Sequence, residues 1–186
     1  MAVTMIDPNT ALVVVELQKG IVALDTAHPA AAVVKRASAL ADAFRSRSLP
    51  VVLVTVAAPP PGRTEQASNV AGLPAGWTDL APEMNQRPTD HLVTKRTWGA
   101  FTNTGLDEHL RGRGVTQVVV AGIATSIGVE STARQAHELG FNVTLAVDAM
   151  TDRSLEAHAN SVTRIFPRLG ETGTTEEIIG LLNRRV

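Results

Sequence analysis

The chain has 186 residues, of which 44% are hydrophobic, and its formal net charge is −1. This length and composition predict one globular domain over residues 1–186, and the balanced charge gives no electrostatic reason to expect nucleic acid as a partner. The sequence has no apolar run of about 18 residues, no signal-like start and no cysteine, which predicts a cytoplasmic protein without membrane contact, disulfides or a thiol nucleophile.

In the first half of the chain, continuous apolar runs alternate with a segment in which apolar residues have helical spacing. After an arm over residues 1–10, residues 11–15 form an unbroken apolar run, which is typical of a strand covered on both faces. Glu16 ends this run, and an acid in that place is unlike an ordinary core residue. The helical spacing of residues 30–47, the apolar run 51–56 and the proline-rich stretch 57–88 then predict a helix, a strand, and a lid or binding loop.

The second half repeats the alternation. A third strand is expected to end at Lys95, and Thr104 with Asp107 predicts a cap for the helix that follows. A capping box from Thr174 to Glu177 is expected to begin the last helix. The predicted strands cover residues 91–94, 117–121, 142–147 and a short stretch at 169–171, and the predicted helices cover residues 104–113, 127–139 and 154–166.

Strands that alternate with helices predict an α/β fold with a parallel sheet, right-handed crossovers and helices on both faces. In such sheets, ligands bind at the carboxyl ends of the strands. Residues 118–134 combine a buried strand, a turn of small residues and a helix start, which offers free N–H groups to an anion. We therefore expect the functional site at this edge, where Glu16 and Lys95 end neighbouring strands and Gly128 opens a helix.

Motifs in this order resemble those of the isochorismatase-like hydrolase superfamily. Glu16 stands in the place of the family's catalytic aspartate at the end of the first strand. Lys95 matches the catalytic lysine and is followed, as in the family, by an Ala-Phe pair at 100–101. Residues 122–134 match the nucleophile motif, except that Gly128 stands where most relatives have the nucleophilic cysteine.

The resemblance implies a Rossmann-like, three-layer α/β/α fold with a six-stranded parallel sheet in the order 3-2-1-4-5-6. It also implies a cis peptide bond between Ile123 and Ala124 and a homo-oligomeric assembly. Asp148 matches the acid that ends the fifth strand in the family. Residues 57–63 lack the metal ligands of nicotinamidases, so we expect no metal and no other cofactor.

Gly128 removes the side chain on which most relatives form a covalent intermediate. In this respect the chain resembles isochorismatases of the phenazine type, which split a vinyl ether without a nucleophilic side chain. The resemblance implies that Glu16 donates a proton to a small, anionic substrate. Burial raises the pKa of a carboxyl and a lysine cation lowers it, and the sequence leaves the balance at Glu16 open. For the nearby hydroxyls of Ser126, Ser131 and Thr132, we expect capping and helix-turn hydrogen bonds.

Alternatives stay open for every candidate site residue. Glu16 and Lys95 form either a catalytic pair or a structural ion pair on a disused site, which would leave an inactive family member that binds a small ligand or serves as a homo-oligomeric assembly. Loop hydrogen bonds and core packing are the structural alternatives for the other residues. Arg96 is expected to be solvated or to lie between subunits, and contact with a substrate carboxylate is its alternative. The residues expected to contact substrate are Gln18, Trp77, Trp98, Phe101, Ile123, Ala124, Thr125 and Gly128.

Overall fold

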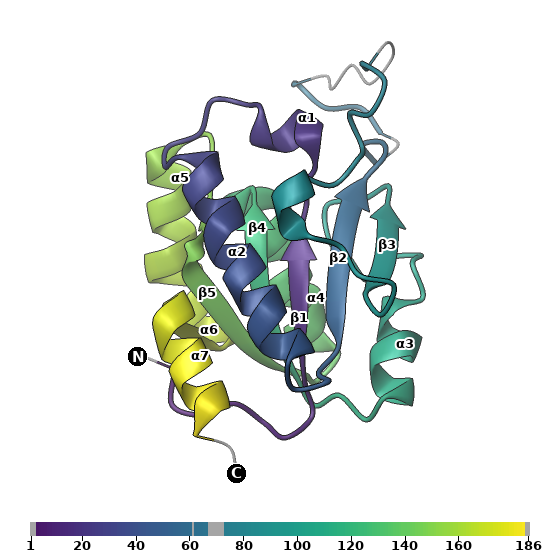
Figure 1. The fold of residues 1–186 in the computed structure, drawn as a ribbon. Helices are drawn as coiled ribbons and strands as arrows, with labels where there is room; N and C mark the ends of the chain where they lie inside the picture. Colours follow the sequence, from purple (N-terminus) through teal and green to yellow (C-terminus); the bar gives the residue numbers. More distant parts are fainter. Residues whose placement is uncertain (1–2, 61, 67–72, 185–186) are drawn as a thin grey trace.

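The computed structural model describes residues 3–60, 62–66 and 73–184, and a six-stranded parallel sheet lies at its centre (Figure 1). The strand order β3-β2-β1-β4-β5-β6 confirms the predicted fold class. The strands are β1 (Thr10–Val15), β2 (Val51–Val56), β3 (His91–Lys95), β4 (Gln117–Ile123), β5 (Asn142–Thr151) and β6 (Glu171–Gly173).

Helices cover both faces of the sheet. One core cluster lies between the sheet and α2, α7 and η1, and the other lies between the sheet and α3, α4 and α6. The helical segments are α1 (Lys19–Val22), α2 (Ala30–Arg45), η1 (Pro82–Met84), α3 (Leu106–Gly112), η2 (Thr125–Val129), α4 (Glu130–Glu138), α5 (Leu155–Asn160), η3 (Ser161–Ile165), α6 (Phe166–Leu169) and α7 (Thr175–Asn183). None of the helices in the described part of the chain is long and apolar enough to cross a membrane.

The central strand β1 explains the unbroken apolar run of the sequence. Its side chains at Leu12 and Val14 enter one core cluster, and those at Val13 and Val15 enter the other. Val15 pairs with Val54 of β2 on one side and with β4 on the other. β1 is buried on both faces and paired along both edges. A side chain from this part of the chain can therefore contact solvent or a ligand only beyond the carboxyl end of the strand.

β5 is longer than predicted. The expected end at residue 147 is wrong, because the strand continues past Asp148 to Thr151 with an irregular register opposite β4. The Asp148 carboxylate accepts hydrogen bonds from the backbone N–H of Thr175 at 2.7 Å and from its hydroxyl at 2.9 Å. The acid therefore joins the strand to the first turn of α7 instead of ending the strand.

Two helices of the second half also differ from their predictions. The residue that precedes α3 is Gly105, with a φ of 72°, and it makes no side-chain cap. Thr104 is thus not the expected cap, because its hydroxyl donates to the carbonyl of Ala100 at 2.6 Å and accepts only a longer bond from Leu106. The predicted helix 154–166 extends to Leu169 and is divided by the π-helical turn η3.

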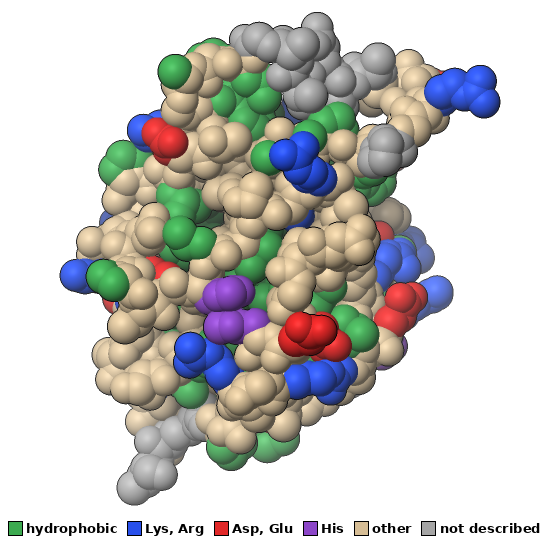
Figure 2. All heavy atoms as spheres, turned by 90° about the vertical axis from the view of Figure 1, so that its right-hand side faces the viewer, with side chains coloured by type: hydrophobic (Ala, Val, Ile, Leu, Met, Phe, Trp, Pro, Cys, Tyr) green, Lys and Arg blue, Asp and Glu red, His purple; other side chains and the backbone are tan. Residues whose placement is uncertain are grey.

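The edge of the sheet at β3 faces the viewer in Figure 2, where two histidine side chains lie together. His91 of β3 stacks on His109 of α3, with ring centroids 3.5 Å apart and an angle of 11° between the rings. Burial and the nearby charge of Arg113 lower the pKa of both imidazoles. The lowered pKa favours the neutral form of each ring, and the stack joins the edge strand to its helix.

The capping box of α7 is confirmed and gives a first prediction. The Thr174 hydroxyl accepts from the backbone N–H of Glu177 at 3.2 Å, and the Glu177 carboxylate accepts from that of Thr174 at 2.7 Å. We expect Thr174→Ala to lower the free energy of unfolding by about 1 kcal/mol, because a helix N–H loses its acceptor. Thr174→Ser keeps the oxygen, so urea unfolding should place it near the wild type; equal losses for both variants would contradict the assignment.

Candidate active site

Glu16 directly follows β1 in an unusual backbone conformation. Its φ is 55°, a left-handed value that residues other than glycine rarely adopt and that tends to occur at functional sites. Its backbone N–H donates to the carbonyl of Val54 at 2.8 Å, which ties this conformation to β2. The side chain is only 12% exposed. The carboxylate is therefore held at the sheet edge and almost enclosed by protein.

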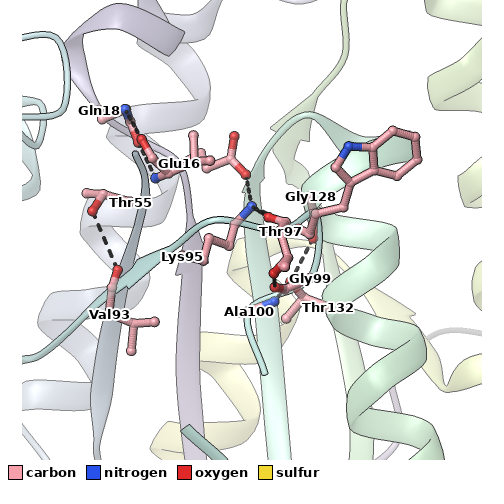
Figure 3. A network of polar contacts seen from close by, with 12 residues as sticks. Glu16, Gln18, Thr55, Val93, Lys95, Thr97, Gly99, Ala100, Gly128 and Thr132 are labelled. Atoms are coloured by element: carbon pink, nitrogen blue, oxygen red, sulfur yellow. Dashed lines mark hydrogen bonds and ion pairs between the residues drawn. The ribbon is translucent and has the colours of Figure 1, made fainter. Parts of the chain in front are cut away.

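Lys95, the last residue of β3, points its ammonium at Glu16 (Figure 3). The side chain is 1% exposed and forms an ion pair with the Glu16 carboxylate. The same ammonium donates to the carbonyls of Thr97 and Trp98, each at 2.8 Å. A lysine ammonium has three N–H groups. Lys95 thus has an internal acceptor for each of them.

The burial of this pair changes the acidity of Glu16. Burial raises the pKa of the Glu16 carboxyl, and the Lys95 ammonium lowers it by its charge and its hydrogen bond. Burial has the larger effect, so the pKa lies above the ordinary range of a glutamate. A carboxyl with a raised pKa keeps its proton to a higher pH, as a general acid requires.

Gly128, in the π-helical turn η2, lies against Glu16. A Cβ atom added at Gly128 would be 2.7 Å from Oε1 of Glu16, which is closer than real Cβ atoms approach their neighbours, and 3.0 Å from Cγ1 of Val15, which is a tight contact. The glutamate oxygen therefore occupies the space that a side chain at 128 would need. The two departures from the family motif, a longer acid and a missing nucleophile, fit together in space.

The turn before Gly128 is hydrogen-bonded to Asp152, a residue that was not predicted from the sequence. Asp152 is 4% exposed, and its carboxylate accepts from the backbone N–H of Ser126 at 2.7 Å and from the Ser126 hydroxyl at 2.8 Å. One N–H group expected to receive a substrate anion is therefore bound by an internal carboxylate. The premature end predicted for β5 hid Asp152, because it placed this residue in a loop.

Ile123, Ala124 and Thr125 precede this turn. The peptide bond between Ile123 and Ala124 is cis, as the resemblance implied. Ile123 and Thr125 are buried, and Ala124 is half-buried. The Thr125 hydroxyl lies 2.9 Å from Nδ1 of His158, so its side chain contacts α5. Because the side chains of Ile123 and Thr125 are buried, these residues can contact a ligand through backbone groups more than through side chains.

Gln18 and Trp77 lie together at the loop after β1. Gln18 is fully buried, and its amide bonds both the N–H and the carbonyl of Val56, at 2.7 and 3.1 Å. It also donates to the carbonyl of Trp77 at 3.4 Å. The Trp77 ring covers Gly20 so closely that an added Cβ at Gly20 would overlap it. These contacts fasten the loop to the sheet and favour the structural alternative for both residues.

The remaining two aromatic candidates differ in exposure. Phe101 packs against the core on the α3 and α4 face, with its ring centroid 5.9 Å from that of Phe141. Trp98 is 55% exposed and follows Lys95 in the turn that accepts its hydrogen bonds. Of the predicted contact residues, the structure brings Trp98 and Gly128 into the surroundings of Glu16 and Lys95. Arg96 is exposed, as expected.

No group of three or more histidine, cysteine, aspartate or glutamate side chains in the described part of the chain is arranged to hold a metal ion. The predicted loop 57–88 is described apart from residues 61 and 67–72, which lie outside the described residues. The site that the structure does define is an acid and a lysine at the carboxyl edge of a parallel sheet, beside a helical turn without a side chain at 128.

Fold and site together define a three-layer α/β/α protein with an acid–lysine centre. Residues 10–177 match the family model described as the isochorismatase domain, and the chain belongs to this family. It is 44% identical over 178 residues to the uncharacterized isochorismatase family protein YwoC of Bacillus subtilis, covering 92% of this chain and 93% of that protein. It is 40% identical over 189 aligned positions to the uncharacterized family protein YecD of Escherichia coli O157:H7, covering 94% and 96%. The structure of an isochorismatase family protein from Burkholderia thailandensis superimposes with a TM-score of 0.92 at 40% identity, covering 96% of this chain and 98% of that one.

Proposed function

We propose that this protein is a hydrolase that cleaves a small, anionic metabolite by proton donation from Glu16, without a covalent intermediate. A vinyl ether of the isochorismate type is the proposed substrate. The observation that carries the proposal is the position of Oε1 of Glu16, 2.7 Å from where a Cβ of residue 128 would stand. The acid thus fills space that a side chain at 128 would need, and this supports an acid in place of a nucleophile. The proposal includes a cytoplasmic location and, as the resemblance implied, a homo-oligomeric assembly.

The reaction needs one acid and one water. The protonated Glu16 carboxyl donates its proton to the terminal enol carbon, which becomes a methyl group and leaves an oxocarbenium ion on the substrate. Water adds to the oxygen-bearing carbon of the oxocarbenium ion, and the proton that the water loses returns to Glu16. The resulting hemiketal breaks its ether bond and releases pyruvate and a dihydroxy acid. Lys95 stabilises the carboxylate form of Glu16 between the two proton transfers, since the two groups form an ion pair.

A second function is favoured by one observation. All three N–H groups of Lys95 have acceptors inside the chain. A structural ion pair has this same arrangement. The alternative is therefore a family member without turnover that binds a small ligand or acts as a homo-oligomeric assembly.

Release of pyruvate from isochorismate, compared between the wild type and Glu16→Gln, tests the proposal. Glutamine has nearly the same shape but carries no acidic proton, so we expect the rate to fall by about 10²- to 10⁴-fold. Glu138→Gln makes the same chemical change at an exposed position of α4 and should retain the wild-type rate. Since the pKa of Glu16 is raised, the wild-type rate should fall only above the usual titration range of a glutamate.

Two outcomes would contradict the proposal in different ways. Full activity in Glu16→Gln would place the proton on another group. An absence of pyruvate from either protein would remove isochorismate as the substrate, and a screen for metabolites that raise the thermal midpoint would then separate another substrate from a disused site.

A further inference from the structure

Two turns of the backbone form the site, and both are attached to α4. One is hydrogen-bonded to side chains of α4, and the other leads directly into this helix. The first turn, residues 97–101, accepts the hydrogen bonds of Lys95 through the carbonyls of Thr97 and Trp98. The second turn is η2, which holds Gly128 against Glu16. The two turns come from distant parts of the sequence. Their relative position decides how the lysine, the acid and the empty position at 128 meet.

Thr132 lies between the two turns (Figure 3). Its hydroxyl accepts a hydrogen bond from the backbone N–H of Ala100 at 3.1 Å and donates one to the carbonyl of Gly128 at 2.7 Å. The side chain is fully buried, so water does not compete for either bond. One hydroxyl group therefore links the turn that holds Lys95 to the turn that holds Gly128.

A second contact shows that the first turn is docked on α4 at two points. The backbone N–H of Phe101 donates to Oε1 of Gln135 at 3.0 Å, one helical turn beyond Thr132. Gly99 lies so close to the Gln135 amide that an added Cβ would overlap it. Gln135 fixes the far end of the turn to the helix, whereas Thr132 is bonded to both turns.

We propose that Thr132 is a positioning residue that couples Lys95 to Gly128 and so sets the place and the acidity of the Glu16 carboxyl. Without the hydroxyl, the N–H of Ala100 and the carbonyl of Gly128 lose this connection. The turn at 97–101 then shifts, and the Lys95 ammonium that it holds moves away from Glu16. Because that ammonium lowers the pKa of Glu16, its retreat raises this pKa further.

Three variants separate positioning from packing. Thr132→Val keeps the shape of the side chain but removes the hydroxyl, and Thr132→Ser keeps the hydroxyl. Thr163→Val is the matched control, because the Thr163 hydroxyl makes the same kind of bond to the carbonyl of Ala159, at 2.7 Å, on an exposed part of η3. If Thr132→Val does not fold, Thr132→Ala removes the same hydroxyl without adding a methyl group.

The first readout does not depend on any substrate. A ¹³C NMR titration of the glutamate carboxyls, assigned with Glu16→Gln, measures the pKa of Glu16, and amide hydrogen exchange measures the protection of Ala100. We expect Thr132→Val to raise the titration midpoint and to speed Ala100 exchange by at least about tenfold. Thr132→Ser and Thr163→Val should match the wild type in both. A wild-type midpoint and wild-type exchange in Thr132→Val would overturn the inference.

The second readout rests on the proposed function. With a substrate that turns over, Thr132→Val should lower kcat by about a hundredfold and leave KM nearly unchanged, because misplacement of about 1 Å costs rate more than affinity. Thr132→Ser should recover most of the rate. If isochorismate is not a substrate, the titration and exchange results still decide whether Thr132 positions the pair, so failure of the one proposal is distinguishable from failure of the other.

Discussion

The single variant Gly128→Cys is expected to lose about 1–3 kcal/mol of stability and, under the proposed function, nearly all hydrolysis, whereas the double variant Glu16→Asp/Gly128→Cys is expected to fold like the wild type. The reason is the contact between residue 128 and Glu16, where an added Cβ is only 2.7 Å from Oε1. Overfilling a packed site costs about 1–3 kcal/mol. Aspartate is one methylene shorter, so it withdraws the oxygen and makes room for the thiol.

A double-mutant cycle measures this coupling. We expect the free energies of unfolding of the two single variants and the double variant to be non-additive by about 1–3 kcal/mol, since the two residues are in contact. Gly180→Cys is the control, because nothing lies within 4 Å of a Cβ added at this helical glycine. The wild-type chain has no cysteine, so alkylation of the installed thiol reports its accessibility without background. Additive free energies would show that Glu16 and residue 128 are independent.

Lys95→Met is expected to destabilise the protein strongly at neutral pH and much less at acidic pH. Removal of one partner of a buried ion pair costs about 3–5 kcal/mol when the other charge stays unpaired. The lysine lowers the pKa of Glu16, so its loss leaves burial to raise that pKa further. A carboxyl whose pKa is raised in the folded state contributes stability below its unfolded pKa, and this contribution is lost as the pH rises through the folded pKa. The loss in Lys95→Met should therefore grow with pH.

Urea unfolding across the pH range checks this result. The double variant Lys95→Met/Glu16→Gln has no charge to bury, so it should regain most of the stability and should lose the pH dependence. Lys35→Met, at an exposed position of α2, should unfold like the wild type at every pH. Under the proposed function, pyruvate release should be at least about a hundredfold slower in Lys95→Met, because the carboxylate form of Glu16 loses its counter-charge. A pH-independent loss of stability would contradict the assigned pairing.

The sequence predicted β1 and β2 well for a physical reason. Strands buried on both faces require unbroken apolar runs, and such runs are visible locally. The strand order came from the family resemblance, because no local pattern specifies which strands pair. The predicted end of β5 at 147 failed because an acid was taken as a strand end, whereas Asp148 is satisfied by a distant helix turn.

The charged pair of the candidate site was predictable, whereas the contacts of Gly128 and Thr132 were not. Glu16 and Lys95 are visible as charges that end apolar runs, and their ion pair follows from the topology. The fit between Glu16 and Gly128 and the φ of 55° at Glu16 could not be predicted, because no local pattern of residues indicates either of them. Thr132 looked like an ordinary helix hydroxyl, and its bond to Ala100 joins residues that are far apart in the sequence.

The turn after Lys95 separates the backbone of Trp98 from its side chain. Its backbone carbonyl at Trp98 is bound by the buried ammonium, while the indole is 55% exposed. Any residue type at 98 supplies the same carbonyl, so a change of this side chain is expected to leave the acid–lysine centre in place. Position 98 is therefore a position of this turn that can be randomised in directed evolution while the backbone bond to Lys95 is kept.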